Sequence, residues 1–150
     1  MKPLSIIITL LTLFLSNATK AQDTYNFKPI RMGGGGYVTG IITCPTEKNL
    51  IYARTDVGGA YRWNETDKSW IPLLDWINDD QWTLLGVESM AIDPQSPNKV
   101  YMSCGLYTNS PSTILRSTDY GATFLSSTNV FPQINGNGMG RQNGERLAVD

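Results

Sequence analysis

Short hydrophobic stretches alternate with clusters of Pro, Asn, Ser and Lys from about residue 37 onward. β-Branched and aromatic residues flank these clusters, which predicts short strands joined by tight turns. The pattern repeats, because Pro45 and Pro94 are 49 positions apart and so are Tyr52 and Tyr101. Each unit therefore indicates a strand, a proline-containing turn and a second strand, with the register kept across the turn.

A turn motif follows the second unit. The stretch Ser117–Phe124, STDYGATF, has the Ser-x-Asp-x-Gly-x-Thr-aromatic order of an Asp-box. Asp119 can accept hydrogen bonds from turn amides, Gly121 permits a positive φ, and Phe124 can fill the space between neighbouring strands. The order predicts a hydrogen-bonded hairpin turn.

A second stretch, Ala53–Trp63 or ARTDVGGAYRW, can be aligned with this hairpin. The alignment places three residues on three others: Asp56 on Asp119, Gly58 on Gly121 and Tyr61 on Phe124. The spacing is then 63 instead of 49, so the second unit would carry 14 additional residues, most simply within Cys104–Thr113. A loop at a fixed place in a repeat often lies on the binding face.

Units of 40 to 50 residues made of short strands are typical of a β-propeller, whose four-stranded antiparallel blades surround a central channel. The predicted class is all-β, with propeller repeats of the Asp-box (BNR) type. A closed ring needs four to eight blades, and residues 22–150 supply about two. We therefore expect an N-terminal part of a longer protein, which folds poorly alone because its last blade has an open edge.

The first 21 residues have the three parts of a secretory signal. Lys2 gives a basic start, an apolar run extends from Leu4 to Leu15, and small residues precede position 22. A membrane anchor is the alternative, but a spanning helix needs about 20 apolar residues and this run is shorter. We expect removal of residues 1–21, a mature chain from Gln22, and a secreted or periplasmic location with no membrane segment.

Composition narrows the chemistry. The chain has 12 basic and 13 acidic side chains and no histidine, with a formal charge of -1. The chain lacks the excess of basic side chains that is typical of nucleic-acid binding. Without histidine, these residues cannot form a His-dependent nucleophile, a His general base or a His-ligated zinc site. Carboxylates, which act in pairs in most glycoside hydrolysis, are the first candidates for proton transfer. Cys44 and Cys104 are expected to be small buried residues rather than disulfide partners.

Asp56 could be either a turn residue or a reacting group. The turn role follows from its alignment with Asp119, whereas Gly58 and Gly59 would let a ligand approach the backbone closely. The surrounding segment is also rich in Tyr and Trp, which can serve as platforms for sugar rings, although core packing is the alternative for each of them. Trp76 and Trp82 flank polar residues and are expected to be exposed.

Two other patterns have simpler explanations. The run Gly33–Gly36 lacks a following Gly-Lys-Ser/Thr, so we expect a tight backbone passage before a strand and not a phosphate site. Asp79 and Asp80 lack the alternating ligand spacing of a cation loop, which favours a solvated turn. We expect neither a metal nor a cofactor.

Four stretches, in this order and spacing, resemble the start of glycoside hydrolase family 74, the xyloglucanases and related endo-glucanases. They are GGGGYVTGIITCPTEKNLIYARTDVGGAYRWNETDKSWIPLLDW, GLYTN, ILRSTDYGATF and MGRQNGERLAVD. The resemblance covers nearly all of residues 30–150. It implies a secreted β-1,4-glucanase of two seven-bladed propellers, which cleaves the backbone of xyloglucan with inversion in the cleft between them.

The resemblance also assigns roles. One catalytic aspartate of the family lies in an Arg-Thr-Asp-Val-Gly-Gly stretch and acts as general base, and here it is Asp56. Its partner, the general acid, lies in the second propeller, which is missing from this chain. Around Asp56 we expect substrate contacts from Gly58, Gly59, Tyr61, Trp82, Tyr107 and Asn109. Glu145 and Arg146 also fall in a family-like motif, where an ion pair that holds the blade is expected.

Some residues depart from the family pattern, and these departures make the identity of the polysaccharide less certain than the type of reaction. Cys44 stands where a histidine is common, and Phe124 where an Asp-box usually has Trp. Xyloglucan or a related β-glucan is the expected partner. An alternative function is a non-catalytic Asp-box propeller that binds glycan or protein. A sialidase is a weaker third hypothesis, because no arginine cluster with a Tyr/Glu pair can be assigned.

Overall fold

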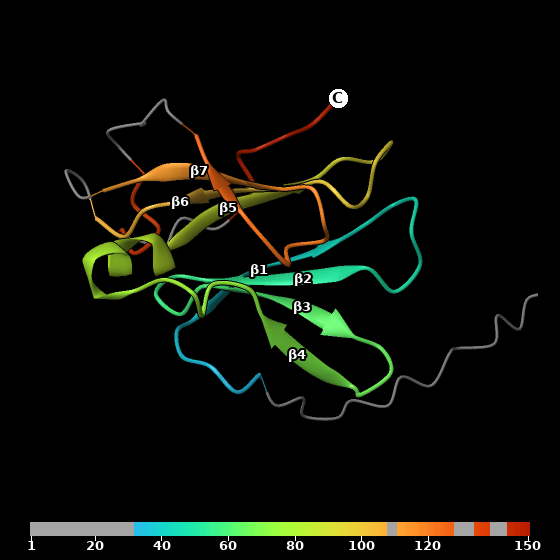
Figure 1. The fold of residues 1–150 in the computed structure, drawn as a ribbon, viewed down its shortest axis with the longest axis horizontal. Helices are drawn as coiled ribbons and strands as arrows, with labels where there is room; N and C mark the ends of the chain where they lie inside the picture. The colour runs from blue at the N-terminus through green and yellow to red at the C-terminus, as the bar shows by residue number, and fades with distance from the viewer. Residues whose placement is uncertain (1–31, 108–110, 128–133, 139–143) are drawn as a thin grey trace, which may run out of the picture.

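The computed structural model describes residues 32–107, 111–127, 134–138 and 144–150. They form two four-stranded antiparallel sheets and one short 3₁₀ helix (Figure 1). Sheet A has the order β1-β2-β3-β4 and sheet B the order β5-β6-β7-β8. The elements are β1 (Val38–Thr43), β2 (Ile51–Thr55), β3 (Ala60–Asn64), β4 (Ser69–Pro72), η1 (Asp79–Leu85), β5 (Val87–Ile92), β6 (Val100–Cys104), β7 (Thr113–Ser117) and β8 (Leu125–Ser126). The predicted signal sequence, residues 1–21, lies outside the described residues.

The strand register confirms the repeat at 49 positions. Ile42 pairs with Tyr52 in sheet A, and Ala91 pairs with Tyr101 in sheet B. Both hairpins also shift register at the start of their first strand, as a β-bulge does. Each repeat unit is therefore the first hairpin of a four-stranded sheet, and the prediction of a mostly β protein is confirmed.

The alignment of Asp56 with Asp119 is wrong. Asp56 follows β2 and precedes β3, whereas Asp119 follows β7 and precedes β8. The two turns thus join the second to the third strand in one sheet and the third to the fourth in the other. Aspartate and glycine recur in tight turns of many kinds, so their shared spacing was a weaker guide than strand order.

The true counterpart of Ser117–Phe124 in sheet A is Trp63–Trp70. Arg62 pairs with Ile71 in sheet A as Arg116 pairs with Leu125 in sheet B, at an offset of 54. Since the first two strands match at an offset of 49, the connection from β6 to β7 is five residues longer than that from β2 to β3, and not 14.

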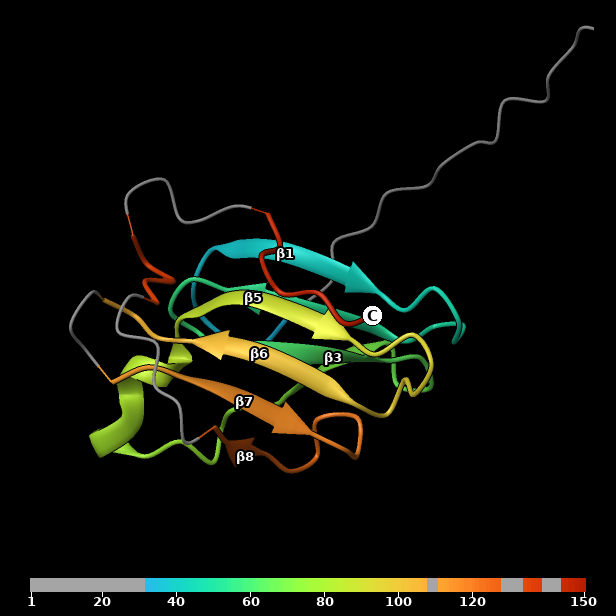
Figure 2. The ribbon, with the colours of Figure 1, turned by 90° about the horizontal axis from the view of Figure 1, so that it is seen from above.

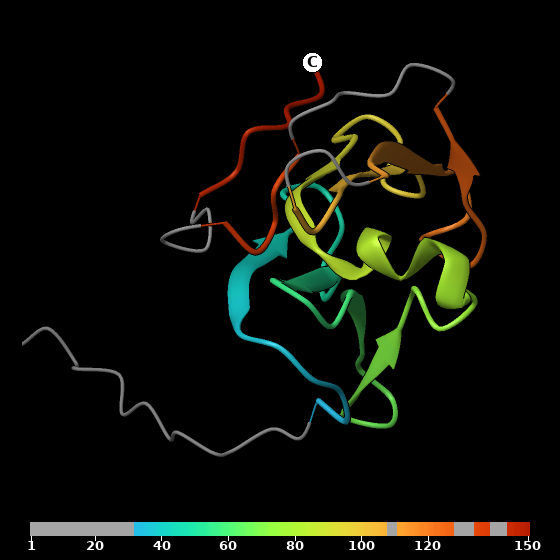
Figure 3. The same cartoon turned by 90° about the vertical axis from the view of Figure 1, so that its left-hand side faces the viewer.

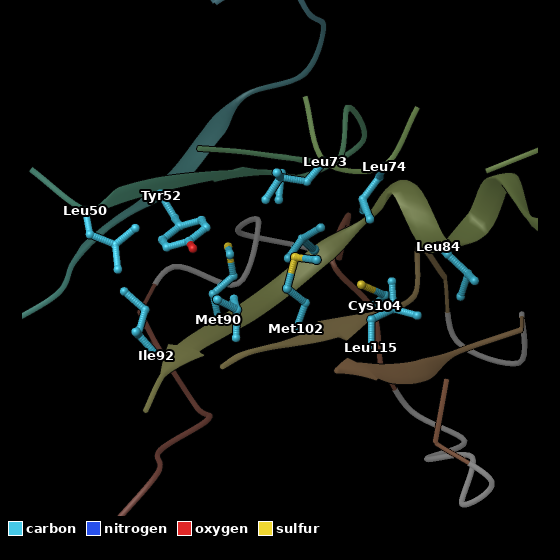
Figure 4. Close-up of a cluster of buried hydrophobic side chains, with 13 residues drawn as sticks. Leu50, Tyr52, Leu73, Leu74, Leu84, Met90, Ile92, Met102, Cys104 and Leu115 are labelled. Atoms are coloured by element: carbon cyan, nitrogen blue, oxygen red, sulfur yellow. The ribbon is translucent and has the colours of Figure 1, made fainter. Parts of the chain in front are cut away.

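The core lies between the two sheets. Figure 4 shows Tyr52 of sheet A facing Met90 and Met102 of sheet B, and all three side chains are buried. β1 and β2 of sheet A lie against β5 of sheet B, as Figure 2 shows for β1 and β5. Full burial of one such apolar side chain contributes roughly 1.5–3 kcal/mol, so the contact between the sheets stabilises both of them.

The prediction that the two cysteines form no disulfide is confirmed, because both are free thiols. Cys104 is buried in the core as predicted, whereas Cys44 is only partly buried and packs against the core. Burial raises the pKa of the Cys104 thiol, which keeps this thiol protonated and unreactive.

The turn from β7 to β8 has the predicted hydrogen bonds. The Thr123 amide donates to Asp119 Oδ1 at 2.9 Å, and the Thr123 hydroxyl donates to Oδ2 at 2.6 Å. Gly121 has φ +86°. Phe124 packs against the core and stacks on Trp76, with ring centroids 6.4 Å apart. The hydrogen bonds from Thr123 and from the Ser117 hydroxyl lower the pKa of Asp119 to about 2.

The same turn also joins the sheets. Tyr120 has a left-handed backbone with φ +60°. Its carbonyl oxygen accepts hydrogen bonds from Arg62 Nη1 at 2.8 Å and from the Tyr52 hydroxyl at 3.2 Å, both in sheet A. The bonds of Asp119 therefore fix a turn that contacts the neighbouring sheet.

We expect Asp119→Asn to destabilise the protein at pH 7 and to lose this effect in acid. Because the folded-state pKa of Asp119 is lower than the ordinary value of about 3.9, its stabilising contribution is complete above that value and is lost as the pH falls towards 2. Unfolding free energies of both proteins, measured in urea between about pH 7 and pH 2, should converge at the acidic end. A difference that stays constant over this range would contradict the assignment.

The connections divide between two ends of the sheets. One end, named here the Asp56 end, carries the start of β1, the turn from β2 to β3, η1 and the connection from β6 to β7. It lies at the left in Figure 1 and faces the viewer in Figure 3, where η1 is the yellow-green coil. The Asp119 turn lies at the other end. Among the described residues, no helix is long and apolar enough to cross a membrane.

Candidate active site

The turn from β2 to β3 is closed by Thr55 rather than by Asp56. The Gly58 amide donates to Thr55 Oγ1 at 2.8 Å, and the Thr55 hydroxyl and amide both donate to the Gly59 carbonyl at 2.9 Å. Gly59 has φ +80°, a conformation that favours glycine. Thr55 thus performs in this turn the capping that Ser117 and Asp119 perform at the other end.

Asp56 is paired with Tyr37, the residue before β1, across the hairpin of β1 and β2. Its Oδ1 atom accepts a hydrogen bond from the Tyr37 amide at 2.7 Å, and its own amide donates to the Tyr37 carbonyl at 3.1 Å. Asp56 is 3% exposed. The carboxylate is therefore held by the chain that enters β1, close beneath the surface of the Asp56 end.

Gly34–Gly36, named here the glycine strap, lies directly on this turn. A Cβ atom on Gly58 would be 1.9 Å from the Gly35 carbonyl oxygen, and one on Gly34 would be 1.7 Å from the Tyr61 hydroxyl oxygen. Both distances are far below van der Waals contact, so glycine is required on the strap and on the turn. The predicted tight backbone passage is confirmed.

Tyr61 supports the turn from inside the molecule. It is 4% exposed, and its hydroxyl donates to the Gly58 carbonyl at 2.8 Å. Burial and the nearby negative charge of Asp75 raise the pKa of Tyr61. The Gly59 amide donates to the Leu85 carbonyl at 2.8 Å, which ties the turn to η1.

Two of the sequence-predicted residues form an exposed aromatic pair. Trp82 on η1 is 50% exposed and Tyr107 after β6 is 44% exposed. Their ring centroids are 6.3 Å apart with the planes at 67°. Asn137 Nδ2 donates to the Tyr107 hydroxyl at 3.3 Å. The exposure predicted for Trp76 and Trp82 is confirmed, and Asn109 lies outside the described residues.

Asp75, Asp79 and Asp80 are exposed at the Asp56 end. The described lysines, Lys48, Lys68 and Lys99, all lie near the turns of the opposite end, where Lys68 pairs with Glu65 and Lys99 pairs with Asp93. In the part of the chain that the structure describes, no group of three or more His, Cys, Asp or Glu side chains could hold a metal ion.

An ion pair behind the site joins buried Arg54 to Glu145, whose side chain is 32% exposed, and the sequence predicted only the Glu145 half of it. Arg54, on β2 two residues before Asp56, is 1% exposed, and its Nε atom is 2.7 Å from Glu145 Oε1. Its guanidinium also donates to Thr39 Oγ1 at 2.6 Å, to the Val87 carbonyl at 3.3 Å and to the Gly144 carbonyl at 3.1 Å. One side chain thus links both sheets and the segment 144–150.

The ion pair expected for Glu145 is confirmed, with Arg54 as its partner. Glu145 Oε2 also accepts from the Ser89 hydroxyl at 2.8 Å and from the Met90 amide at 2.7 Å. Arg146 forms a separate, half-exposed pair with Glu88 at 3.1 Å. An arginine in an otherwise apolar strand was the sequence signal for Arg54, but only the fold identifies its partner.

Comparison with known proteins gives close relatives. The chain is 49% identical over 150 residues to the oligoxyloglucan-reducing end-specific xyloglucanase of Emericella nidulans. The match covers 97% of this chain and 18% of that protein. It is 50% identical over 134 residues to a xyloglucanase of Paenibacillus sp, with 86% and 13% covered. No protein-family model matches the chain.

Solved structures give the same relationship. The crystal structure of a GH74 xyloglucanase from Xanthomonas campestris matches with a TM-score of 0.73 and 43% identity, over 85% of this chain and 18% of that one. A GH74 enzyme from Niastella koreensis matches with a TM-score of 0.71 and 45% identity, over 81% and 18%. The chain spans less than a fifth of the length of these relatives.

Proposed function

Because this chain carries a glycoside hydrolase family 74 sequence over most of its length, we propose that a protein containing it cleaves the β-1,4-glucan backbone of xyloglucan. Asp56 is the general base in this proposal. Sheets A and B are the first two blades of a seven-bladed propeller, and the predicted signal sequence directs the protein out of the cytoplasm. The names of the relatives support the substrate class.

One observation supports the assignment of Asp56 more than any other. The carboxylate is held in one position by the Tyr37 amide at 2.7 Å, while hydrogen bonds of Thr55 close the turn beside it. A carboxylate fixed in this way suits a general base, since catalysis depends on the position of the reacting group as well as on its chemistry.

The proposed reaction inverts the anomeric carbon. Asp56, ionised, takes one proton from a water molecule while the water oxygen forms a bond to the anomeric carbon. The glycosidic bond breaks, and the departing oxygen takes a proton from an acid in a second propeller outside this chain. The two carboxyl groups of an inverting pair lie about 6.5–9.5 Å apart, which leaves room for the water. A cleft between two domains meets this requirement.

The exposed aromatic pair is the proposed platform for the sugar rings. Trp82 and Tyr107 lie at the same end of the sheets as Asp56, and the Gly59 amide connects the Asp56 turn to the helix that carries Trp82. Asn109 follows Tyr107 closely in the chain and is a further proposed contact. Gly58 and Gly59 take part through the backbone of the turn, and buried Tyr61 supports that backbone.

The stereochemistry of the product tests this function. A protein that contains this chain and the rest of a family 74 sequence is incubated with xyloglucan, and proton NMR follows the new reducing ends from the first minutes. An inverting enzyme releases the α-anomer first, before mutarotation. Unbranched β-1,4-glucan is the comparison substrate. Release of the β-anomer would overturn the mechanism, and binding of xyloglucan without cleavage would favour the non-catalytic propeller.

A further inference from the structure

We propose that Gly36 and the Tyr37 amide are positioning groups for the Asp56 carboxylate, and that this role explains the glycine at position 36. The inference rests on the proposed function of Asp56. According to this inference, the reaction also depends on the segment that enters β1, which lies outside the Asp56 turn.

The first step concerns the hydrogen bonds of Tyr37. Its amide donates to Asp56 Oδ1 at 2.7 Å, and its carbonyl accepts from the Asp56 amide at 3.1 Å. The two bonds connect one residue of the entering chain to the side chain and the main chain of Asp56 together. A displacement of Tyr37 therefore changes the orientation of the carboxylate relative to its own backbone.

The second step concerns Gly36, which places the Tyr37 amide. Gly36 has φ +90°, which L side chains rarely adopt. A Cβ atom here would be 3.0 Å from Asp56 Oδ1, 3.0 Å from the Gly58 amide nitrogen and 3.1 Å from Thr55 Cβ. The added atom would thus contact the same carboxylate oxygen that accepts the hydrogen bond from the Tyr37 amide.

The third step shows that the turn has little room to yield. Gly58 already lies against the Gly35 carbonyl, where a Cβ would be 1.9 Å away. The Gly58 carbonyl is held from the other side by the Tyr61 hydroxyl at 2.8 Å. Extra volume at position 36 must therefore be accommodated by the carboxylate or by the strap.

Gly36→Ala tests the proposal by steady-state kinetics on xyloglucan, in the same full-length protein. Misplacement of a reacting group by about 1 Å can cost about 10²-fold in rate. We expect kcat to fall roughly 10- to 100-fold, with KM changed less than about twofold, because the aromatic platform is untouched. A residue with a merely structural role would change the melting temperature without this selective loss of kcat.

Gly33→Ala is the matched control. Gly33 also has a left-handed backbone, with φ +71°, but a Cβ atom there has nothing within 4 Å. It therefore reproduces the backbone strain of Gly36→Ala without contact to Asp56. We expect Gly33→Ala to lower the melting temperature less than Gly36→Ala, because it adds backbone strain without close contacts, and to leave kcat within about twofold of wild type.

The outcomes separate the two proposals. If Gly36→Ala and Gly33→Ala have the same kcat, or if Gly36→Ala acts only on KM, the positioning role is overturned while Asp56 can still be the base. If Asp56→Ala itself retains the wild-type rate, the proposed function fails, whatever the glycine variants do.

Discussion

Asp56→Ala is expected to lower kcat on xyloglucan by about 10² to 10⁴, the usual contribution of a positioned general base. KM and the affinity for xyloglucan oligosaccharides, measured by calorimetry, should change little, because Trp82 and Tyr107 lie outside the substitution. Azide should restore part of the rate to the alanine variant. It is a nucleophile that needs no proton removed, and it attacks the anomeric carbon in place of water to give a glycosyl azide.

Asp56→Asn separates the catalytic role from a structural one. The asparagine side chain has the same shape, and its Oδ1 can still accept the hydrogen bond from the Tyr37 amide. It cannot take a proton from water at neutral pH. We expect wild-type stability and a kcat as low as that of Asp56→Ala. Wild-type kcat in Asp56→Asn would return Asp56 to a purely structural role, as would an alanine variant of normal rate and reduced stability.

The second large effect is expected at the ion pair of Arg54 and Glu145. Glu145→Gln should destabilise the protein by about 1–3 kcal/mol, which is less than for a fully buried pair because the Glu145 side chain is 32% exposed. The reason is that Arg54 is 1% exposed and would keep its charge without an anionic partner. Urea unfolding followed by tryptophan fluorescence measures the change.

Two further variants make this result specific. Arg146→Gln, which removes the half-exposed pair with Glu88, should cost less than about 1 kcal/mol. The double variant Arg54→Met/Glu145→Leu should be less destabilised than the sum of the single changes, since it leaves no uncompensated charge. Equal losses in Glu145→Gln and Arg146→Gln would show that Arg54 reaches solvent when its partner is neutral.

Much of the local structure was predictable because it depends on near neighbours. The spacing of Tyr52 and Tyr101 identified the first hairpin of each sheet, since β-branched and aromatic residues around proline turns favour paired strands. The hydrogen-bond acceptor of the Asp119 turn and its positive φ were also predictable. The side-chain bonds of Asp119 join residues within a few positions of one another.

The comparison of Asp56 with Asp119 failed for the converse reason. An Asp and a Gly at a fixed spacing identify a tight turn but not the two strands that the turn joins. Strand order in the sheets assigns the two turns to opposite ends of the molecule. Because Thr55 caps the Asp56 turn, the role of the Asp56 carboxylate cannot be inferred from the Asp-box pattern.

The sequence by itself therefore determined the strands, the turns and the family resemblance, since these follow from local hydrogen bonding and from the order of residue types. Only the tertiary structure decided the surroundings of Asp56. Tyr37 lies 19 positions away, across the hairpin of β1 and β2, and Glu145 lies 91 positions from Arg54. The first pairing depends on the strand register, and the second on how residues 144–150 pack against the two sheets. Gly34 and Gly36 likewise have their reason only in the tertiary structure, because a side chain at Gly34 would meet Tyr61 on β3 and one at Gly36 would meet Thr55, Asp56 and Gly58.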